Sequence, residues 1–203
     1  MKHPLRNRYY IMRHGQSMAN VKGIIVSSPE HGIDAYGLTD KGKHQAREAI
    51  KGWPVLDAST RIVASDFLRT RQTAQEVRDL LQCNTAVEHS SLIRERFFGT
   101  WELTSDKNYG KVWADDRNMT TRHQVEPVEQ VLSRALACIA GLEACHEKKS
   151  ILLVSHGDTL QILITHFLGW PPTRHREVDP MTVAQIRSLN PAALLTERLP
   201  VKS

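Results

Sequence analysis

The feature of the sequence that most constrains the fold is the apolar run Ser150–Ser155, which reads SILLVS and is followed at once by His156 and Gly157. A continuous apolar run of this length is typical of a strand buried on both faces, as central strands of parallel sheets are. A second short run, 8–12, ends in the same way at Arg13-His14-Gly15. The sequence therefore predicts two buried strands that each end at a histidine.

Helical patterns separate the predicted strands, and this alternation is typical of a parallel sheet with right-handed crossovers. The expected strands are 8–12, 61–65, a weak one at 85–88, 150–155 and an edge strand at 182–189. The expected helices are 40–53, 67–82, 128–144 and 156–168, with a short helix near 109–116 inside an otherwise irregular segment, 92–121. Segment 20–37 has the composition of a long loop. We predict an α/β fold, a three-layer α/β/α sandwich with a mostly parallel central sheet, as a single domain over 1–203 with its core at about 8–190.

Length and composition fit one globular domain, because a chain of 203 residues can bury a sufficient hydrophobic core without disulfide bonds or bound metal ions. The N-terminus is polar, and no apolar run approaches the roughly 18 residues that a membrane helix needs. Three cysteines at unpatterned spacing are typical of reduced thiols. We therefore expect a cytoplasmic protein with no membrane partner. The oligomeric state is not predicted.

The formal charge of +5 favours anionic partners. Specific binding of nucleic acid is not expected, because Lys and Arg are scattered and aromatic residues make up only 6% of the chain. A small phosphorylated substrate is the partner we expect instead.

The two strand-ending histidines can meet, because parallel strands place their carboxyl ends along one edge of the sheet. A neutral imidazole is a nucleophile toward phosphorus, and its adduct divides hydrolysis into two easier transfers. Phosphoryl transfer also needs fixed positive charge around the phosphate, which Arg13 and Arg69 can supply. Arg71 and Arg78, on the helix of Arg69, are expected to point to solvent. The alternative is that His14 and His156 are only capping or core residues.

Several blocks of the sequence resemble the histidine phosphatase superfamily, also called phosphoglycerate mutase-like. They occur in the order that the family has and span about residues 8–190. The blocks are Arg13-His14-Gly15-Gln16-Ser17 with Asn20; Leu38-Thr39 with Gly42 and Gln45-Ala46; Ser65-Asp66-Phe67-Leu68-Arg69-Thr70 with Gln72-Thr73-Ala74; Arg94-Glu95 with Phe98-Gly99 and Trp101-Glu102; and Ser155-His156-Gly157.

The resemblance implies a metal-independent phosphatase of the histidine acid type, without a cofactor, that hydrolyses a phosphate ester through a phosphohistidine on His14. Arg13, Arg69 and His156 would form the phosphate pocket, with Asn20, Ser17 and Gly157 adding neutral contacts. Glu95 would protonate the leaving oxygen and then activate water. Burial beside Phe97 and Phe98 would suit that role, because it would raise the pKa of this carboxyl. Glu102 is the rival acid, although it resembles a structural glutamate of the family.

Departures from the family pattern favour a phosphatase over a mutase. Leu103 stands where many members have glycine, so we expect the loop beyond Glu102 to take another path. Gln16 and Asp158 replace residues usual in the mutases, and the segment before residue 128 is short. A mutase-type phosphotransferase and a non-catalytic module that binds phosphate or protein remain the alternatives, and a protein substrate is open. Segment 174–176, Arg-His-Arg, is interpreted as an exposed basic loop rather than part of the entrance to the site.

Overall fold

The structure is a computed structural model, and it describes residues 5–190. The prediction of a single domain over 1–203 remains a prediction. The sequence also predicts a loosely ordered tail from Pro191 onward, where two prolines occur, and this segment lies outside the described residues. Among the helices of residues 5–190, none has both the length and the apolar character needed to cross a membrane.

A five-stranded sheet forms the centre of the molecule, in the order β3-β2-β4-β1-β5. β4 is buried at all six positions and pairs in parallel with β1 on one side and β2 on the other. β3 continues the parallel set, whereas β5 is antiparallel to β1 at the edge. The predicted α/β fold and the central place of the SILLVS strand are confirmed. The strands are β1 Arg8–Arg13, β2 Arg61–Ala64, β3 Glu88–His89, β4 Ser150–Ser155 and β5 Ile186–Ser188.

Seven α-helices within the described residues surround this sheet. They are α1 Met18–Lys22, α2 Pro29–Gly32, α3 Asp40–Lys51, α4 Leu68–Leu81, α5 Tyr109–Arg117, α6 Val128–Cys145 and α7 Gly157–Phe167. Short 3₁₀ helices lie at η1 Ser91–Ile93, η2 Gly99–Trp101, η3 Asp106–Asn108 and η4 Pro172–Glu177. Segment 20–37 is not wholly a loop as expected, because Ser17 and Ser28 cap the short helices α1 and α2. The weak strand expected at 85–88 is formed only at Glu88–His89.

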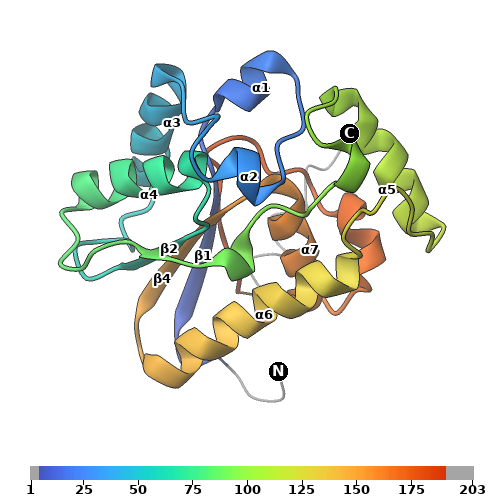
Figure 1. Cartoon of the computed structure of the whole chain (residues 1–203). Helices are drawn as coiled ribbons and strands as arrows, with labels where there is room; N and C mark the ends of the chain where they lie inside the picture. The colour runs from blue at the N-terminus through green and yellow to red at the C-terminus, as the bar shows by residue number, and fades with distance from the viewer. Residues whose placement is uncertain (1–4, 191–203) are drawn as a thin grey trace, which may run out of the picture.

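Successive residues of β4 face opposite cores, as the two-residue period of a strand requires. Leu152 and Val154 belong to one core with residues of α3 and α4. Ile151 and Leu153 belong to the other core with residues of α6 and α7. The sheet is therefore covered on both faces, which confirms the predicted three-layer arrangement (Figure 1).

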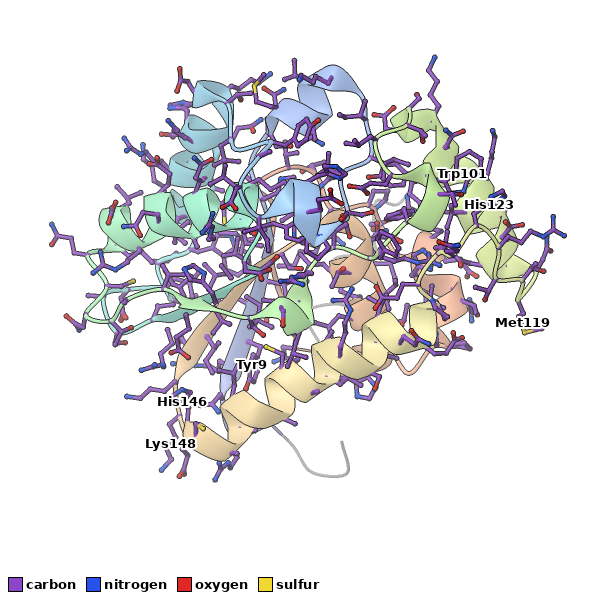
Figure 2. The ribbon with its side chains drawn as sticks, in the orientation of Figure 1. Tyr9, Trp101, Met119, His123, His146 and Lys148 are labelled. Carbon is purple, nitrogen blue, oxygen red and sulfur yellow. The ribbon has the colours of Figure 1, made fainter. Side chains whose placement is uncertain are left out.

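The end of β1 that begins the strand is tied to α6, away from the strand-ending histidines. Tyr9 Oη donates to Glu143 Oε1 at 2.8 Å, and the Asn7 side-chain amide donates to the same oxygen at 2.7 Å. Figure 2 shows Tyr9, His146 and Lys148 at this end of the molecule, where β1 begins and α6 ends. These bonds fix β1 along its axis, so that its other end has a defined position.

Two glycines pack backbone against backbone where the chain leaves β1. A Cβ on Gly15 would lie 2.3 Å from the Gly42 carbonyl oxygen, and a Cβ on Gly42 would lie 2.1 Å from the Gln16 carbonyl oxygen. No rotamer change can relieve a clash with a carbonyl group, so only glycine allows α3 to approach this closely. The contact holds the turn after His14 against the first turn of α3.

We expect Gly42→Ala to lower the free energy of unfolding by about 1–3 kcal/mol, since the backbone around it must shift. Gly141→Ala is the matched control, because Gly141 lies within α6 with nothing within 4 Å of its added Cβ. There alanine should stabilise by about 0.5–1 kcal/mol through its helix propensity. Thermal unfolding measures the Tm of both variants. Equal Tm values would show that the close backbone contact at Gly42 does not restrict that position to glycine.

Candidate active site

The two strand-ending histidines lie side by side because their strands pair in register. Arg13 is opposite Ser155 in the β1–β4 ladder, and the next residues along the chain are His14 and His156. The His14 backbone N–H also donates to the Ser155 carbonyl at 3.0 Å. The two imidazole centroids are 5.3 Å apart, and both rings are buried.

The Arg69 side chain lies between the two rings. It comes from the first turn of α4, and its Nε is 3.1 Å from His14 Nε2 and 3.2 Å from His156 Nδ1. Nη2 donates to the Val26 carbonyl at 2.9 Å. Nη1 is buried, and no group within residues 5–190 accepts a hydrogen bond from it. An arginine N–H left without an acceptor among imidazoles is suited to an anionic oxygen.

The hydrogen bonds assign the ring protons of both histidines. Because a guanidinium can only donate, His14 Nε2 and His156 Nδ1 must carry lone pairs. His14 Nδ1 donates to the Gly15 carbonyl at 2.7 Å, and His156 Nε2 is 3.0 Å from Ser65 Oγ. Burial lowers the pKa of His14, and the charges of Arg69 and Arg13 lower it further. Burial and Arg69 likewise lower the pKa of His156. Both rings are neutral, and the lone pair of His14 Nε2 accepts from Arg69 Nε.

Arg13 completes the group of four side chains. Its Nη1 donates to the Met181 carbonyl at 2.7 Å, while its buried Nε has no acceptor in the described part of the chain. The guanidinium packs on Gly157, where an added Cβ would lie 3.3 Å from Arg13 Nε. The structure thus brings together Arg13, His14, Arg69 and His156, the residues that the sequence predicted to surround a phosphate.

Glu95 is buried and lines the cavity beside this group. Its Oε1 accepts from the Arg96 backbone N–H at 3.0 Å and lies 3.3 Å from Thr159 Oγ1. Burial raises the pKa of Glu95, the charge of Asp158 raises it further, and Arg69 opposes the shift. Of the two aromatic neighbours in sequence, Phe98 is buried but Phe97 is exposed. A carboxyl that favours its protonated form is suited to general acid chemistry.

Glu102, the rival acid, has another place. It accepts from the Ser27 backbone N–H, the Ser27 hydroxyl and the Ser28 backbone N–H at 2.6–3.1 Å, and it pairs with His31 at 3.0 Å. Its oxygens are used to hold the chain before α2. This arrangement gives Glu102 a structural role, and of the two candidate acids Glu95 is the one that lines the cavity.

Leu103 stands in the backbone conformation that glycine prefers, with a φ of 61°. This left-handed region costs a residue with a Cβ about 1–2 kcal/mol. The chain therefore turns at Leu103 with a backbone conformation typical of glycine, and the different path that we expected for the loop beyond Glu102 remains a prediction. Trp101 and His123 then hold the two ends of the following segment together, with ring centroids 4.7 Å apart (Figure 2).

Ser17 and Asn20 form the N-terminal cap of α1. The Ser17 backbone N–H and hydroxyl both donate to Asn20 Oδ1 at 3.0 Å. Ser17 is buried in this pair, whereas Asn20 is exposed and lines the cavity. Contact of either residue with phosphate remains a prediction, and here the Ser17 hydroxyl is engaged in capping.

A cavity of about 240 Å³ opens beside Arg13, Glu95 and Gly157. The sequence reasoning missed much of its wall. Tyr109 and Trp113 come from α5, and Asp158 and Gln161 from the start of α7. The one sequence signal for this wall is that Asp158 directly follows His156 and Gly157, which places it next to the predicted phosphate pocket. Among residues 5–190 there is no cluster of three or more His, Cys, Asp or Glu side chains that could hold a metal ion.

Comparison with known proteins is decisive for the family. The profile of the histidine phosphatase superfamily (branch 1) matches residues 9–192. The chain belongs to this superfamily.

Its relatives include phosphatases and mutases. A protein named as a probable phosphoglycerate mutase from Photorhabdus laumondii is 30% identical over 83% of this chain and 78% of its own length. An adenosylcobalamin/alpha-ribazole phosphatase from Salmonella typhimurium is 27% identical over 81% of each chain. A mycobacterial glucosyl-3-phosphoglycerate phosphatase, solved with VO3, shares the fold with a TM-score of 0.74 at 22% identity, over 89% of this chain and 91% of that one.

The basic segment of this histidine phosphatase is not the exposed loop that we expected. Arg174 is exposed and pairs with Glu177 at 2.5 Å. His175, in contrast, is fully buried, and Arg176 lines the cavity with its side chain 21% exposed. Arg71 and Arg78 also differ from expectation, because each donates to a main-chain carbonyl and is only about one-third exposed.

A buried ion network supports the wall of the cavity. Arg96 binds Asp116 with two hydrogen bonds of 2.6 and 2.7 Å and reaches Asp158 at 3.3 Å. Trp113 Nε1 donates to Asp158 at 3.0 Å. Burial would raise the pKa of Asp158, but His175, Arg96 and Arg176 reverse the effect and hold it below its usual range. The network joins the segment of Glu95 to α5 and α7.

We expect Arg96→Leu to lower the free energy of unfolding by about 3–5 kcal/mol, because two buried carboxylates lose their shared cation. Arg94→Leu is the matched control two residues away. Arg94 and its partner Asp66 are about one-quarter exposed. The loss there should be about 1 kcal/mol, as for ion pairs that water reaches. Denaturant unfolding measures the free energy of unfolding of both variants. Similar decreases would show that burial of the Arg96 ion pair does not determine its contribution to stability.

Proposed function

We propose that this protein is a phosphomonoesterase that hydrolyses the phosphate ester of a small metabolite through a phosphohistidine on His14. The observation that carries the proposal is the Arg69 guanidinium between two neutral imidazoles, with a buried N–H that has no acceptor within residues 5–190. Arg13 adds a second such N–H. These groups supply the fixed positive charge on which phosphoryl transfer depends, so the mechanism needs no metal ion.

In the first step, His14 Nε2 attacks phosphorus and the bond from phosphorus to the ester oxygen breaks. The Gly15 carbonyl keeps the Nδ1 proton in place during the attack. Arg13 and Arg69 donate to the equatorial oxygens, His156 orients Arg69 by accepting from its Nε, and Glu95 transfers its proton to the departing alkoxide. The products of this step are a free alcohol, a phosphorylated His14 and an ionised Glu95.

In the second step, a water molecule attacks the phosphorus atom bound to His14 Nε2. The Glu95 carboxylate, produced in the first step, accepts a proton from this water as the new bond to phosphorus forms. The bond between His14 Nε2 and phosphorus breaks, inorganic phosphate leaves, and both residues return to their starting protonation states.

Three observations support the finer parts of the proposal. The cavity, at about 240 Å³, is small, which favours a compact metabolite over a phosphoprotein. Cys83 and Cys138 are buried free thiols, as expected in the cytoplasm, where we place the protein. Relatives named as phosphatases favour hydrolysis. Relatives named as phosphoglycerate mutases keep mutase-type transfer as the second candidate, and formation of an isomerised product that depends on a bisphosphate primer would identify it.

We expect His14→Ala to lose hydrolysis by a factor of about 10⁴ or more and to form no phosphoenzyme, because the nucleophile is removed. Release of inorganic phosphate from a panel of sugar phosphates, nucleotides and phosphopeptides measures the first effect. Quenching in alkaline detergent with ³²P-labelled substrate measures the second, and the trapped wild-type adduct should be labile in acid and stable in alkali.

His146→Ala is the control. His146 lies at the end of the molecule where β1 begins (Figure 2), so this substitution should leave turnover unchanged. A chelator should also leave the wild-type rate unchanged. Turnover retained by His14→Ala would reject the proposed nucleophile.

The pH profile of kcat/KM should be bell-shaped. His14 must be neutral, and its lowered pKa places loss of activity on the acid side below the usual histidine range. Glu95 must be protonated, and its raised pKa carries activity above the usual carboxyl range before it falls as pH rises. Glu95→Gln should remove the alkaline limb and slow alkyl phosphates by a factor of about 10²–10⁴.

With p-nitrophenyl phosphate the leaving group needs little protonation. Glu95→Gln should then release a burst of nitrophenol, followed by slow turnover because the phosphoenzyme lacks its base. A Glu95→Gln variant that keeps the wild-type profile would exclude Glu95 as the acid.

A further inference from the structure

The cavity has a second cationic group away from the phosphate-binding residues. Arg176 comes from η4, and its guanidinium carbon lies 3.6 Å from the centroid of the Trp113 ring. Its Nη1 donates to Gln161 Oε1 at 2.5 Å. Stacking on an indole and one strong hydrogen bond fix the plane of the guanidinium. Arg176 is therefore a rigid cation at the wall of a small cavity.

His175, the residue before Arg176, is held by its neighbours. Its Nδ1 is 3.1 Å from the Pro172 carbonyl, which can only accept, so Nδ1 carries a proton. Nε2 faces Asp158 Oδ1 at 3.4 Å and Asp116 Oδ2 at 3.9 Å. The two carboxylates therefore face His175 and Arg96, and Asp158 also faces Arg176.

Asp158 is the carboxylate that pairs with Arg176, and it is shared. Its oxygens lie 3.3 Å from Arg96 Nη1, 3.0 Å from Trp113 Nε1 and 3.8 Å from Arg176 Nη1. Arg176 is therefore not the sole partner of Asp158, and of the two arginines of this network it is the one that lines the cavity.

The other charged residues around the cavity leave Arg176 available to a ligand. Burial raises the pKa of Glu95, which disfavours its negative charge. Asp106 also lines the cavity but is exposed, so water and salt screen its charge. Burial lowers the pKa of Arg176, Asp158 opposes this shift, and Arg13 adds to it. Two guanidinium groups, of Arg13 and Arg176, therefore line one small cavity.

We propose that Arg176 determines specificity by binding a second anionic group, a carboxylate or another phosphate, on the alcohol part of the substrate. The inference rests on the proposed function, because it assigns the leaving-group side of the same site. A planar guanidinium with a fixed orientation matches the two oxygens of a carboxylate. The cavity volume of about 240 Å³ limits the alcohol to a few carbon atoms. The preferred substrates are compact, doubly anionic phosphate monoesters.

Binding of ligands that cannot be hydrolysed tests this without turnover. We would measure by calorimetry the Kd values of 3-phosphonopropanoate, propane-1,3-bisphosphonate and propylphosphonate, which share a phosphonate and differ in the second anion. The wild-type protein should bind at least one doubly anionic ligand about tenfold more tightly than propylphosphonate, the factor expected for one charge-assisted contact. The stronger of the two identifies carboxylate or phosphate as the recognised group.

Arg176→Gln should reduce this ratio to about one, and Arg176→Lys should retain part of it because the charge remains. Arg174→Gln is the matched control, since Arg174 is exposed and pairs with Glu177, and it should keep the wild-type ratio. The wild-type comparison does not depend on how well any variant folds.

Equal binding of the three ligands by the wild type would overturn the inference, as would a ratio that persists in Arg176→Gln. Failure of the proposed function has a different signature. A protein that shows the preference among phosphonates but releases phosphate from no ester would reject the phosphatase and retain the anion site.

Discussion

The site depends on the parallel pairing of β1 with β4, which places His14 and His156 at the same edge of the sheet. That pairing makes room for a single guanidinium between two rings and fixes which nitrogens carry lone pairs. Burial then has opposite effects on neighbouring groups. It lowers the pKa of the imidazoles and raises the pKa of Glu95, so the same exclusion of water favours the neutral form of the proposed nucleophile and the protonated form of the proposed acid.

The elements with strong patterns could be predicted from the sequence, and they carry most of the phosphate-binding group. The apolar run of β4 and the helix expected at 128–144, observed as Val128–Cys145, are examples. α1 and α2 were missed because helices of five and four residues are too short to show a period, and their capping serines stabilise them locally. β3 has only two residues, so its register depends on β2 and not on its own composition.

The far wall of the cavity could not be predicted, because a buried polar network assembles it. Trp113 and Arg176 lie in segments without periodicity, and no hydrophobic pattern marks them. Burial of His175 and the contact of Arg176 with Trp113 follow from charges on α5 and α7 that meet only in the folded chain. A run of basic residues therefore resembles a solvated loop until the carboxylates that face it are known.

The hydrogen bonds of Thr159 have a consequence for motion in the site. Its hydroxyl lies 2.8 Å from the Arg94 carbonyl and 3.3 Å from Glu95 Oε1, and Thr159 is in the first turn of α7, the helix that His156 caps. The start of α7 thus contacts Glu95, the proposed proton donor, and follows directly on His156. If α7 moves as the phosphoryl group arrives, both travel together, and the alignment between the scissile bond and its acid survives the displacement.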